Sequence, residues 1–156
     1  MNRDERMIDY ILRSTEDESD LSIKLIEVEA RRYPSARLSI IIKDSRYGIQ
    51  EVDIWIDVDE LKHISNSLEC ILDSTKSTLQ TTSMSPREFQ LRITKINNRG
   101  YFEIRYEINR HRYVENHLVE DGFYSGFITE YQQIVRLKNK VEKLIDYIIK
   151  SDNNVD

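Results

Sequence analysis

Two stretches of this chain follow the same plan, and that repetition limits the fold more than any other feature. Residues 50–72 (QEVDIWIDVDELKHISNSLECIL) alternate apolar and polar side chains, reach an acidic cluster and then change to helical spacing. Residues 112–137 (RYVENHLVEDGFYSGFITEYQQIVRL) do the same, and two strand-like runs precede each stretch. A period of two is typical of half-buried strands, and apolar residues three or four apart are typical of an amphipathic helix. The pattern predicts two copies of a strand–strand–strand–helix unit.

The predicted fold class is therefore α+β. The copies span about residues 20–73 and 87–150, and a polar Ser/Thr-rich connector, residues 74–86, joins them. We expect them to form one antiparallel sheet of about six strands with both main helices packed on one face. A chain of 156 residues is large enough for its own core, so residues 1–156 are predicted to form one domain.

The first copy begins at a change of phase. Apolar residues alternate up to Leu25 and then, from Ile26, in the opposite phase, which predicts a bulged strand. Helical spacing also fits residues 21–31, so both alternatives stay open there. Before this copy, residues 1–13 have the spacing of a short helix, and residues 14–20 (STEDESD) have the composition of a polar loop.

Clear alternation follows in residues 36–42 and 52–58, separated by a turn that ends at Gly48. Apolar residues then take helical spacing as far as Leu72. Asp57 or Asp59 is the expected N-cap, because aspartate accepts hydrogen bonds from the free amides of a first helical turn.

In the second copy, residues 89–93 and 102–108 alternate around Asn97–Gly100, a hairpin signal. Asn109–Arg110 is interpreted as a weaker turn, and residues 114–118 as a charged edge strand.

A long C-terminal helix is predicted near residues 123–150, after a break at Asp121–Gly122. At 1.5 Å per residue it would run for about 40 Å, which is longer than a strand of about 17–20 Å. The excess would overhang the sheet, cover both copies or pack against another subunit, so a homodimer through this helix is one expectation.

Composition limits the function classes. The net charge is −5 and the only cysteine is Cys70, which fits a reducing compartment and a cytoplasmic protein, although it also fits an exported protein without disulfides. The N-terminal residues lack the apolar stretch of a signal peptide, and no apolar run is long enough to cross a membrane, so no membrane contact is expected. No Gly-rich phosphate loop, nucleophile elbow or zinc-binding motif occurs, so we predict no cofactor and no enzymatic activity.

Two polar clusters could carry chemistry. Asp53, Asp57 and Asp59 offer carboxylates to a hard cation, although the same residues fit the outer side of a strand that ends in a helix cap. His111 and His117, with Tyr113 and Glu115 between them, would share one strand face, where zinc is conceivable but solvent exposure is the more common arrangement.

Trp55 lies on the polar side of its strand, opposite the apolar face. It is either covered by a second layer or exposed, and an exposed tryptophan ringed by carboxylates is typical of a protein interface. The predicted partner-binding surface is therefore Asp53, Trp55, Asp57 and Asp59, meeting a basic partner.

Residues 86–120 hold 7 Arg/Lys against 5 Glu, a net +2 in an acidic chain. Aromatic residues are interleaved with these cations, and such surfaces can bind nucleic acid. A nucleic-acid-binding protein using strands in residues 92–113 is thus the alternative function, with these contacts: Arg92, Arg99, Arg105, Arg110 and Arg112.

The chain resembles the WapI-type immunity proteins and related small bacterial or phage proteins. The resemblance is carried by residues 36–44 (ARLSIIIKD), by residues 52–72 with the helix pattern D-x-D-E-L-x-x-I-x-x-x-L, and by residues 88–96 (EFQLRITKI). It implies a small cytoplasmic protein that binds and neutralises a toxin. The resulting hypothesis is a non-enzymatic protein-binding module, an immunity protein or other bacterial or phage conflict protein.

Overall fold

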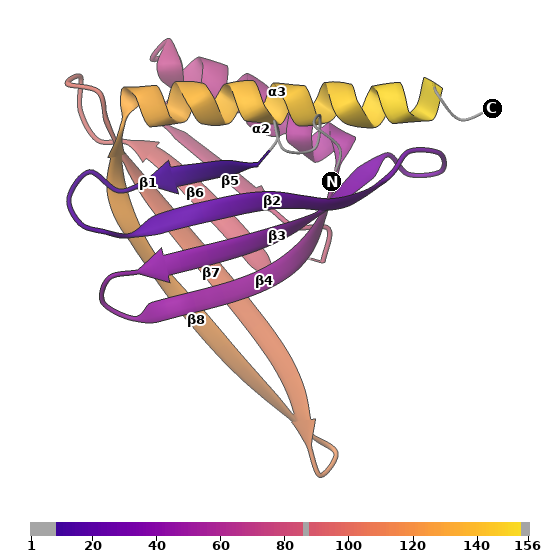
Figure 1. The fold of residues 1–156 in the computed structure, drawn as a ribbon. Helices are drawn as coiled ribbons and strands as arrows, with labels where there is room; N and C mark the ends of the chain where they lie inside the picture. Colours follow the sequence, from indigo (N-terminus) through magenta and orange to yellow (C-terminus); the bar gives the residue numbers. More distant parts are fainter. Residues whose placement is uncertain (1–8, 86–87, 154–156) are drawn as a thin grey trace.

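The computed structural model describes residues 9–85 and 88–153, which form two four-stranded antiparallel sheets and two helices (Figure 1). In each sheet the strands lie side by side in chain order. The first unit consists of β1 (Tyr10–Arg13), β2 (Asp20–Glu29), β3 (Ser35–Asp44), β4 (Gly48–Asp57) and α2 (Val58–Leu72). The second consists of β5 (Thr78–Thr82), β6 (Phe89–Lys95), β7 (Tyr101–Val114), β8 (His117–Glu130) and α3 (Tyr131–Asn153).

The α+β class and the C-terminal helix are confirmed, but the single sheet of about six strands is wrong. Each unit contains a fourth strand that the sequence pattern did not show. β1 lies where a short helix was expected over residues 1–13, of which residues 1–8 lie outside the described residues. β5 lies within the predicted connector, where Leu79 and Thr81 are buried. Both strands are short, and neither alternates clearly: β1 is apolar at three successive positions and β5 has a single apolar residue, so a period of two does not stand out.

The bulged strand is confirmed. β2 pairs with β3 along its whole length, and the register shifts between Leu25 and Glu27. The change of phase in the sequence therefore marks an extra residue in a strand, and the helical alternative for residues 21–31 is wrong.

The predicted turn at Asn109–Arg110 and the helix start near residue 123 are also wrong. β7 continues to Val114, and the chain turns at Glu115 and Asn116, which both have positive φ. β8 then runs through Asp121–Gly122 as far as Glu130.

Glycine in β8 allows a close approach to β7 and does not end the strand. A Cβ at Gly126 would lie 2.3 Å from the backbone oxygen of Ile104. The same residue type that predicts a break in sequence therefore serves here to bring two paired strands together.

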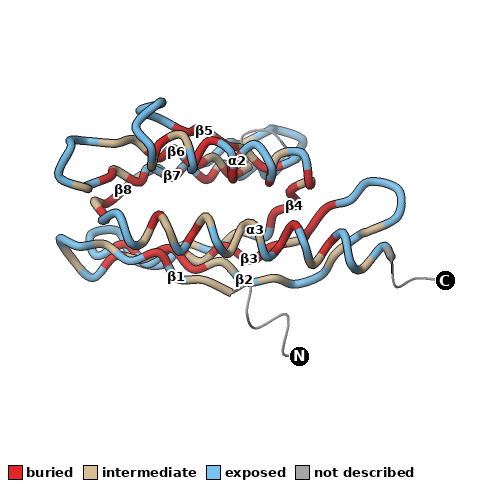
Figure 2. The backbone as a smooth tube through the Cα atoms, turned by 90° about the horizontal axis from the view of Figure 1, so that it is seen from above, coloured by how far each residue is buried: buried red, intermediate tan, exposed pale blue. Residues whose placement is uncertain are grey.

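The two units exchange their helices. α2 lies beside β5 and α3 beside β1, and the helices pack against each other along one open side between the sheets. Figure 2 shows α2 in the layer of β5–β8 and α3 in the layer of β1–β4. The expected arrangement, with both helices on one face of one sheet, is therefore wrong. The shared core receives the apolar inner faces of both sheets and helices, and each fully buried Leu or Ile contributes about 1.5–3 kcal/mol.

Matching backbone hydrogen bonds connect the two units. The amide of Thr15 donates to the carbonyl of Ile128 on β8, and the amide of Met84 donates to that of Trp55 on β4, both at 2.8 Å. Thr15 and Met84 each follow the first strand of their unit by two residues, and the acceptors each precede a helix by three. Each unit thus covers part of the edge strand of the other, which blocks pairing with another chain there.

Asp57 is confirmed as the N-cap of α2, because its Oδ1 accepts the amide of Glu60 at 2.6 Å. We expect Asp57→Ala to lower the free energy of unfolding by about 1 kcal/mol in urea denaturation. Asp57→Asn is the matched control and should retain most of the stability, since asparagine caps equally well. An equal loss in both variants would contradict the capping role.

Candidate functional site

The hairpin of β7 and β8 extends beyond the rest of the molecule as a two-stranded arm (Figure 1). β7 and β8 hold 14 residues each, whereas the equivalent β3 and β4 hold 10 each. In the first unit, the short turn of residues 45–47 joins β3 to β4. At the equivalent place in the second unit, residues 111–120 project, and we call these residues the arm. All of them are exposed except Val119, which is half-buried.

The end of the arm carries exposed apolar side chains next to its polar turn, Glu115–Asn116. Tyr113 lies directly opposite Leu118 on one face of the hairpin and is 75% exposed, and Val114, opposite His117 on the other face, is also exposed. Sequence reasoning missed this site because it placed the turn too early. The signal was present in Glu115–Asn116 between two alternating runs, since asparagine tolerates the positive φ of a tight hairpin.

Charged pairs line the stem of the arm. Nδ1 of His111 lies 3.6 Å from Oε1 of Glu120, and Nε of Arg112 lies 3.4 Å from Oδ2 of Asp121. Exposed pairs of this kind contribute little to stability. They link β7 to β8, and the exposed apolar side chains at the end of the arm are its distinctive feature.

The predicted histidine row does not form on one strand face. His111 and Tyr113 lie on β7, Glu115 is in the turn, and His117 lies on β8 opposite Val114. Within residues 9–85 and 88–153, no group of three or more His, Cys, Asp or Glu side chains is placed to hold a metal ion.

The predicted acidic surface lies on the outer side of β4. Asp53, Trp55 and Asp57 alternate along that strand, Asp59 is in the first turn of α2, and Trp55 is 37% exposed. Two of the carboxylates already have partners within the chain. Asp53 forms an ion pair with Arg37 at 3.0 Å, and Asp57 caps α2, so less free negative charge surrounds the indole than the sequence indicated.

The five predicted nucleic-acid contacts are not brought together. Arg92 and Arg105 lie directly opposite each other on the outer face of β6 and β7, beside a shallow hollow of about 350 Å³. Arg99 is in the turn before β7, and Arg112 is on the arm. Arg110 donates from its Nη2 to the carbonyl of a β4 residue at 2.7 Å, so its guanidinium connects the two sheets.

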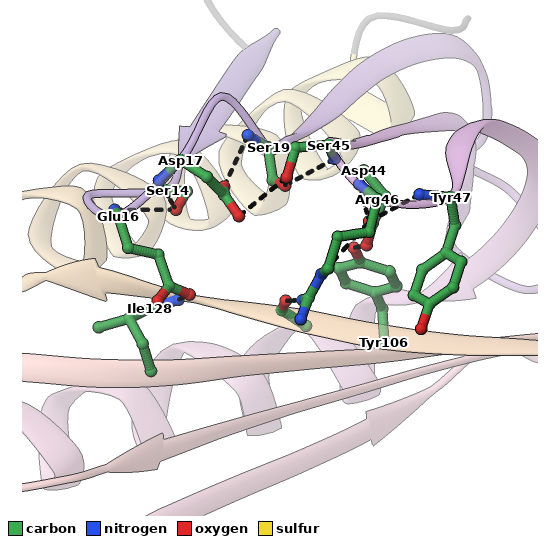
Figure 3. Close-up of polar contacts among 11 residues, drawn as sticks. Ser14, Glu16, Asp17, Ser19, Asp44, Ser45, Arg46, Tyr47, Tyr106 and Ile128 are labelled. Atoms are coloured by element: carbon green, nitrogen blue, oxygen red, sulfur yellow. Dashed lines mark hydrogen bonds and ion pairs between the residues drawn. The ribbon is translucent and has the colours of Figure 1, made fainter.

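Asp44, at the end of β3, is a buried carboxylate inside a polar cluster (Figure 3). The hydroxyl of Tyr106 donates to its Oδ2 at 2.6 Å, and the amides of Arg46 and Tyr47 donate to its Oδ1. Burial opposes ionisation, but the hydrogen bonds from Ser125, Tyr106 and these two amides outweigh it and hold the pKa of Asp44 below its usual value. Burial, with the hydrogen bond to Asp44, raises the pKa of Tyr106.

The same cluster ties the turns of the first sheet to β8. Nη2 of Arg46 donates to the carbonyl of Gly126 at 3.1 Å, and the amide of Ile128 donates to Oε1 of Glu16 at 3.1 Å (Figure 3). Asp44 is enclosed and fully hydrogen-bonded, so its geometry suits a structural connection between the sheets better than proton transfer.

No model of a known protein family matches this chain, and neither does any curated protein. The resemblance to WapI-type immunity proteins therefore stays a prediction. Neither helix in the described residues is long and apolar enough to cross a membrane.

The buried hydrogen bond between Tyr106 and Asp44 predicts a specific dependence of the free energy of unfolding on pH. A carboxylate whose pKa is depressed by folding stabilises the protein above its unfolded pKa of about 3.9. That contribution is lost as the pH falls through the folded pKa of Asp44. We expect Asp44→Asn to be less stable than wild type at pH 7 and the difference to shrink below about pH 4. Urea denaturation across this range measures it.

Tyr106→Phe should lower the free energy of unfolding by about 1–3 kcal/mol at pH 7, because it removes a hydrogen-bond donor from a buried carboxylate.

For the Asp44→Asn prediction, Asp146→Asn is the control, since it changes an exposed carboxylate away from the cluster. A wild-type advantage over Asp44→Asn that persists unchanged down to pH 2 would exclude the proposed role of the charge.

Proposed function

We propose that this protein is a non-enzymatic protein-binding module whose arm inserts its apolar tip into an apolar groove of a partner protein. The supporting observation is the arm itself. It has no counterpart in the first unit, and its exposed Tyr113, Val114 and Leu118 contact no part of the shared core.

Apolar side chains gathered at the end of a projecting element are unfavourable in water unless a partner covers them. Single exposed apolar residues are normal on a protein surface, whereas a contiguous group marks an interaction site. Tyrosine is a frequent anchor at such sites because it offers a large area with few rotatable bonds. The paired strands of the arm also hold the tip in shape before binding, which reduces the entropy lost on association.

The acidic surface on β4 is the second proposed contact, for a partner with basic side chains. Trp55 would supply the apolar anchor and Asp59 the free charge, while Asp53 and Asp57 also serve within the chain. Following the resemblance, we propose a role as an immunity protein or other bacterial or phage conflict protein in the cytoplasm, which neutralises its partner by covering a functional surface.

A homodimer through α3 is a further proposal, and it would use a small surface. The apolar side of α3 that includes Ile134, Leu137 and Leu144 is buried within the chain. Tyr131 and Ile149 remain exposed on this helix. Sedimentation velocity of Ile149→Ser against wild type tests whether they mediate self-association.

Nucleic-acid binding remains the alternative, and one observation favours it. Arg92 and Arg105 are direct cross-strand partners beside the hollow on the outer face of β6 and β7, where both guanidinium groups are exposed, although Glu103 already forms an ion pair with Arg105 at 2.8 Å. Phosphate contacts make affinity fall steeply with salt. Salt-dependent binding of oligonucleotides that Arg92→Gln and Arg105→Gln both weaken would support this alternative over the arm.

The arm is tested with affinity capture from the native host by the full-length chain, followed by titration of the purified partner. Tyr113→Ser and Leu118→Ser should each weaken binding about tenfold or more, because truncating an interface anchor costs over 1 kcal/mol. Tyr47→Ser and Ile49→Ser are matched controls, since both residues are exposed but lie in the first unit, outside the acidic surface.

Circular dichroism should show all four variants folded. If Tyr113→Ser and Leu118→Ser leave the affinity unchanged and Trp55→Ala reduces it, the partner binds at the acidic surface and not at the arm. Binding that none of these variants affects would refute both proposed surfaces.

A further inference from the structure

β8 is an edge strand of the second sheet, and only part of its outer edge is covered (Figure 1). In an antiparallel pair, residues whose amide and carbonyl face the other strand alternate with residues whose groups face away from it. Ile128 faces away from β7, because its carbonyl accepts the amide of Thr15 and its amide donates to the carboxylate of Glu16. The carbonyl of Gly126, two residues earlier, accepts Nη2 of Arg46. The outer edge of β8 is thus occupied near α3.

The same alternation leaves a run of outward-facing residues between Gly126 and the turn of the arm. The pairing of β8 with β7 has no register shift, so the alternation continues unbroken to the turn. The outward-facing residues of this run, all of them exposed, are Leu118, Glu120, Gly122 and Tyr124. Within residues 9–85 and 88–153, no hydrogen bond from outside the hairpin reaches their amides or carbonyls. We call residues 118–124 the open edge.

The equivalent edge of β4 is covered more fully. The carbonyl of Trp55 accepts the amide of Met84, and the carbonyl of Glu51 accepts Nη2 of Arg110. Asp53 lies between these two covered positions, so two outward-facing residues in succession are not open there. A continuous open edge is therefore a property of β8 and not of both edge strands.

The side chains of the open edge follow a defined order. Two adjacent carboxylates, Glu120 and Asp121, lie at its centre, and residues 118–124 include no Lys or Arg. Apolar and aromatic side chains flank the carboxylates on both sides: Leu118 and Val119 before them, Phe123 and Tyr124 after them. The best complement is an extended segment with two adjacent basic residues between apolar ones, because opposite charges on neighbouring strands stabilise their pairing.

The two carboxylates can still accept such a segment. His111 and Arg112 approach them from the β7 side, but the side chains of Glu120 and Asp121 are 67% and 62% exposed. A carboxylate accepts several hydrogen bonds, so an ion pair on one side leaves acceptor positions for a donor on the other.

We propose that the open edge binds an extended basic segment of a partner protein, which pairs with β8 as an additional strand of the second sheet. Hydrogen bonds to the outward-facing amides and carbonyls would supply affinity, and the order of side chains would select the segment. The proposal rests on the protein-binding function proposed above, because a partner protein would supply the segment. It does not require insertion of the tip of the arm into a groove.

A second copy of this chain fits the open edge less well. An antiparallel two-fold pairing that uses every outward-facing residue would place the Asp121 residues of the two chains directly opposite each other. Both Glu120 carboxylates would lie one position away. Like charges directly opposite each other destabilise strand pairing, so the charges that attract a basic segment also oppose self-association.

A synthetic peptide, Val-Ile-Thr-Lys-Arg-Val-Ile blocked at both ends, is the probe. It is titrated into the full-length protein and followed by calorimetry and amide NMR. In the antiparallel register its Lys and Arg lie opposite Asp121 and Glu120. Binding should slow hydrogen exchange at the outward-facing amides of the open edge, because a bound strand covers them.

N-methylation of the peptide separates strand pairing from simple charge attraction. Methylation of its Thr and Arg amides, which would face β8, should weaken binding about tenfold or more. Methylation of its Lys and second Val amides, which would face away, is the matched control and should leave binding almost unchanged. Equal affinities of the two methylated peptides would overturn the proposal.

The charges are tested by Glu120→Lys and by a peptide with Glu-Asp in place of Lys-Arg. Each change should weaken binding about tenfold, whereas Glu115→Lys, in the turn of the same hairpin, should leave it almost unchanged. Tyr113→Ser should not affect peptide binding, so failure of the tip proposal and failure of this one are distinguishable. Absence of peptide binding at millimolar concentration would overturn the proposal. Protection of the same amides by self-association of the protein alone would also overturn it.

Discussion

The structure depends on the exchange of helices between its two units. A four-stranded sheet with one apolar face must bury that face against another layer. Here α2 lies beside β5 and α3 beside β1, so the helix of each unit extends the layer of the other. The inner face of each sheet is covered by the opposite unit, and the two units therefore share one core. Conformational entropy disfavours folding by an amount close to what burial contributes, and half of this core would not stabilise one unit alone.

Positions that are equivalent in the two units have different roles. In the first unit the end of β3 and the turn after it connect the sheets, because Asp44 accepts a hydrogen bond from Tyr106 and Arg46 donates one to Gly126. In the second unit the same place is occupied by the arm, which contributes nothing to the core. The arm is thus a departure from the internal symmetry, and it forms a proposed binding site.

Much of the fold could be predicted where periodicity was strong. The repeat, the bulge after Leu25, the Asp57 cap and the Asn97–Gly100 hairpin all follow from local chemistry. The weak strands β1 and β5 could not be found in this way, because their short segments pair through their backbones and need no clear apolar alternation. Gly122 suggested a break because the pairing of β8 with β7 at this position cannot be seen in sequence.

The candidate sites were harder to predict than the fold. Residues 114–118 of the arm were interpreted as a charged edge strand after a turn at Asn109–Arg110, and His111 and His117 as ends of one polar row. Trp55 was correctly placed on the outer side of β4, but its ring of free carboxylates was overestimated, since Arg37 and the helix cap engage two of them.

Native-state hydrogen exchange at increasing urea concentration tests the shared core most directly. If the units depend on each other, the slowest amides of β3 and α2 and those of β7 and α3 should exchange with the same opening free energy and the same denaturant dependence. Exchange of β3 and α2 through an opening of clearly lower free energy, while β7 and α3 stay protected, would show that the units fold separately. That result would contradict the account.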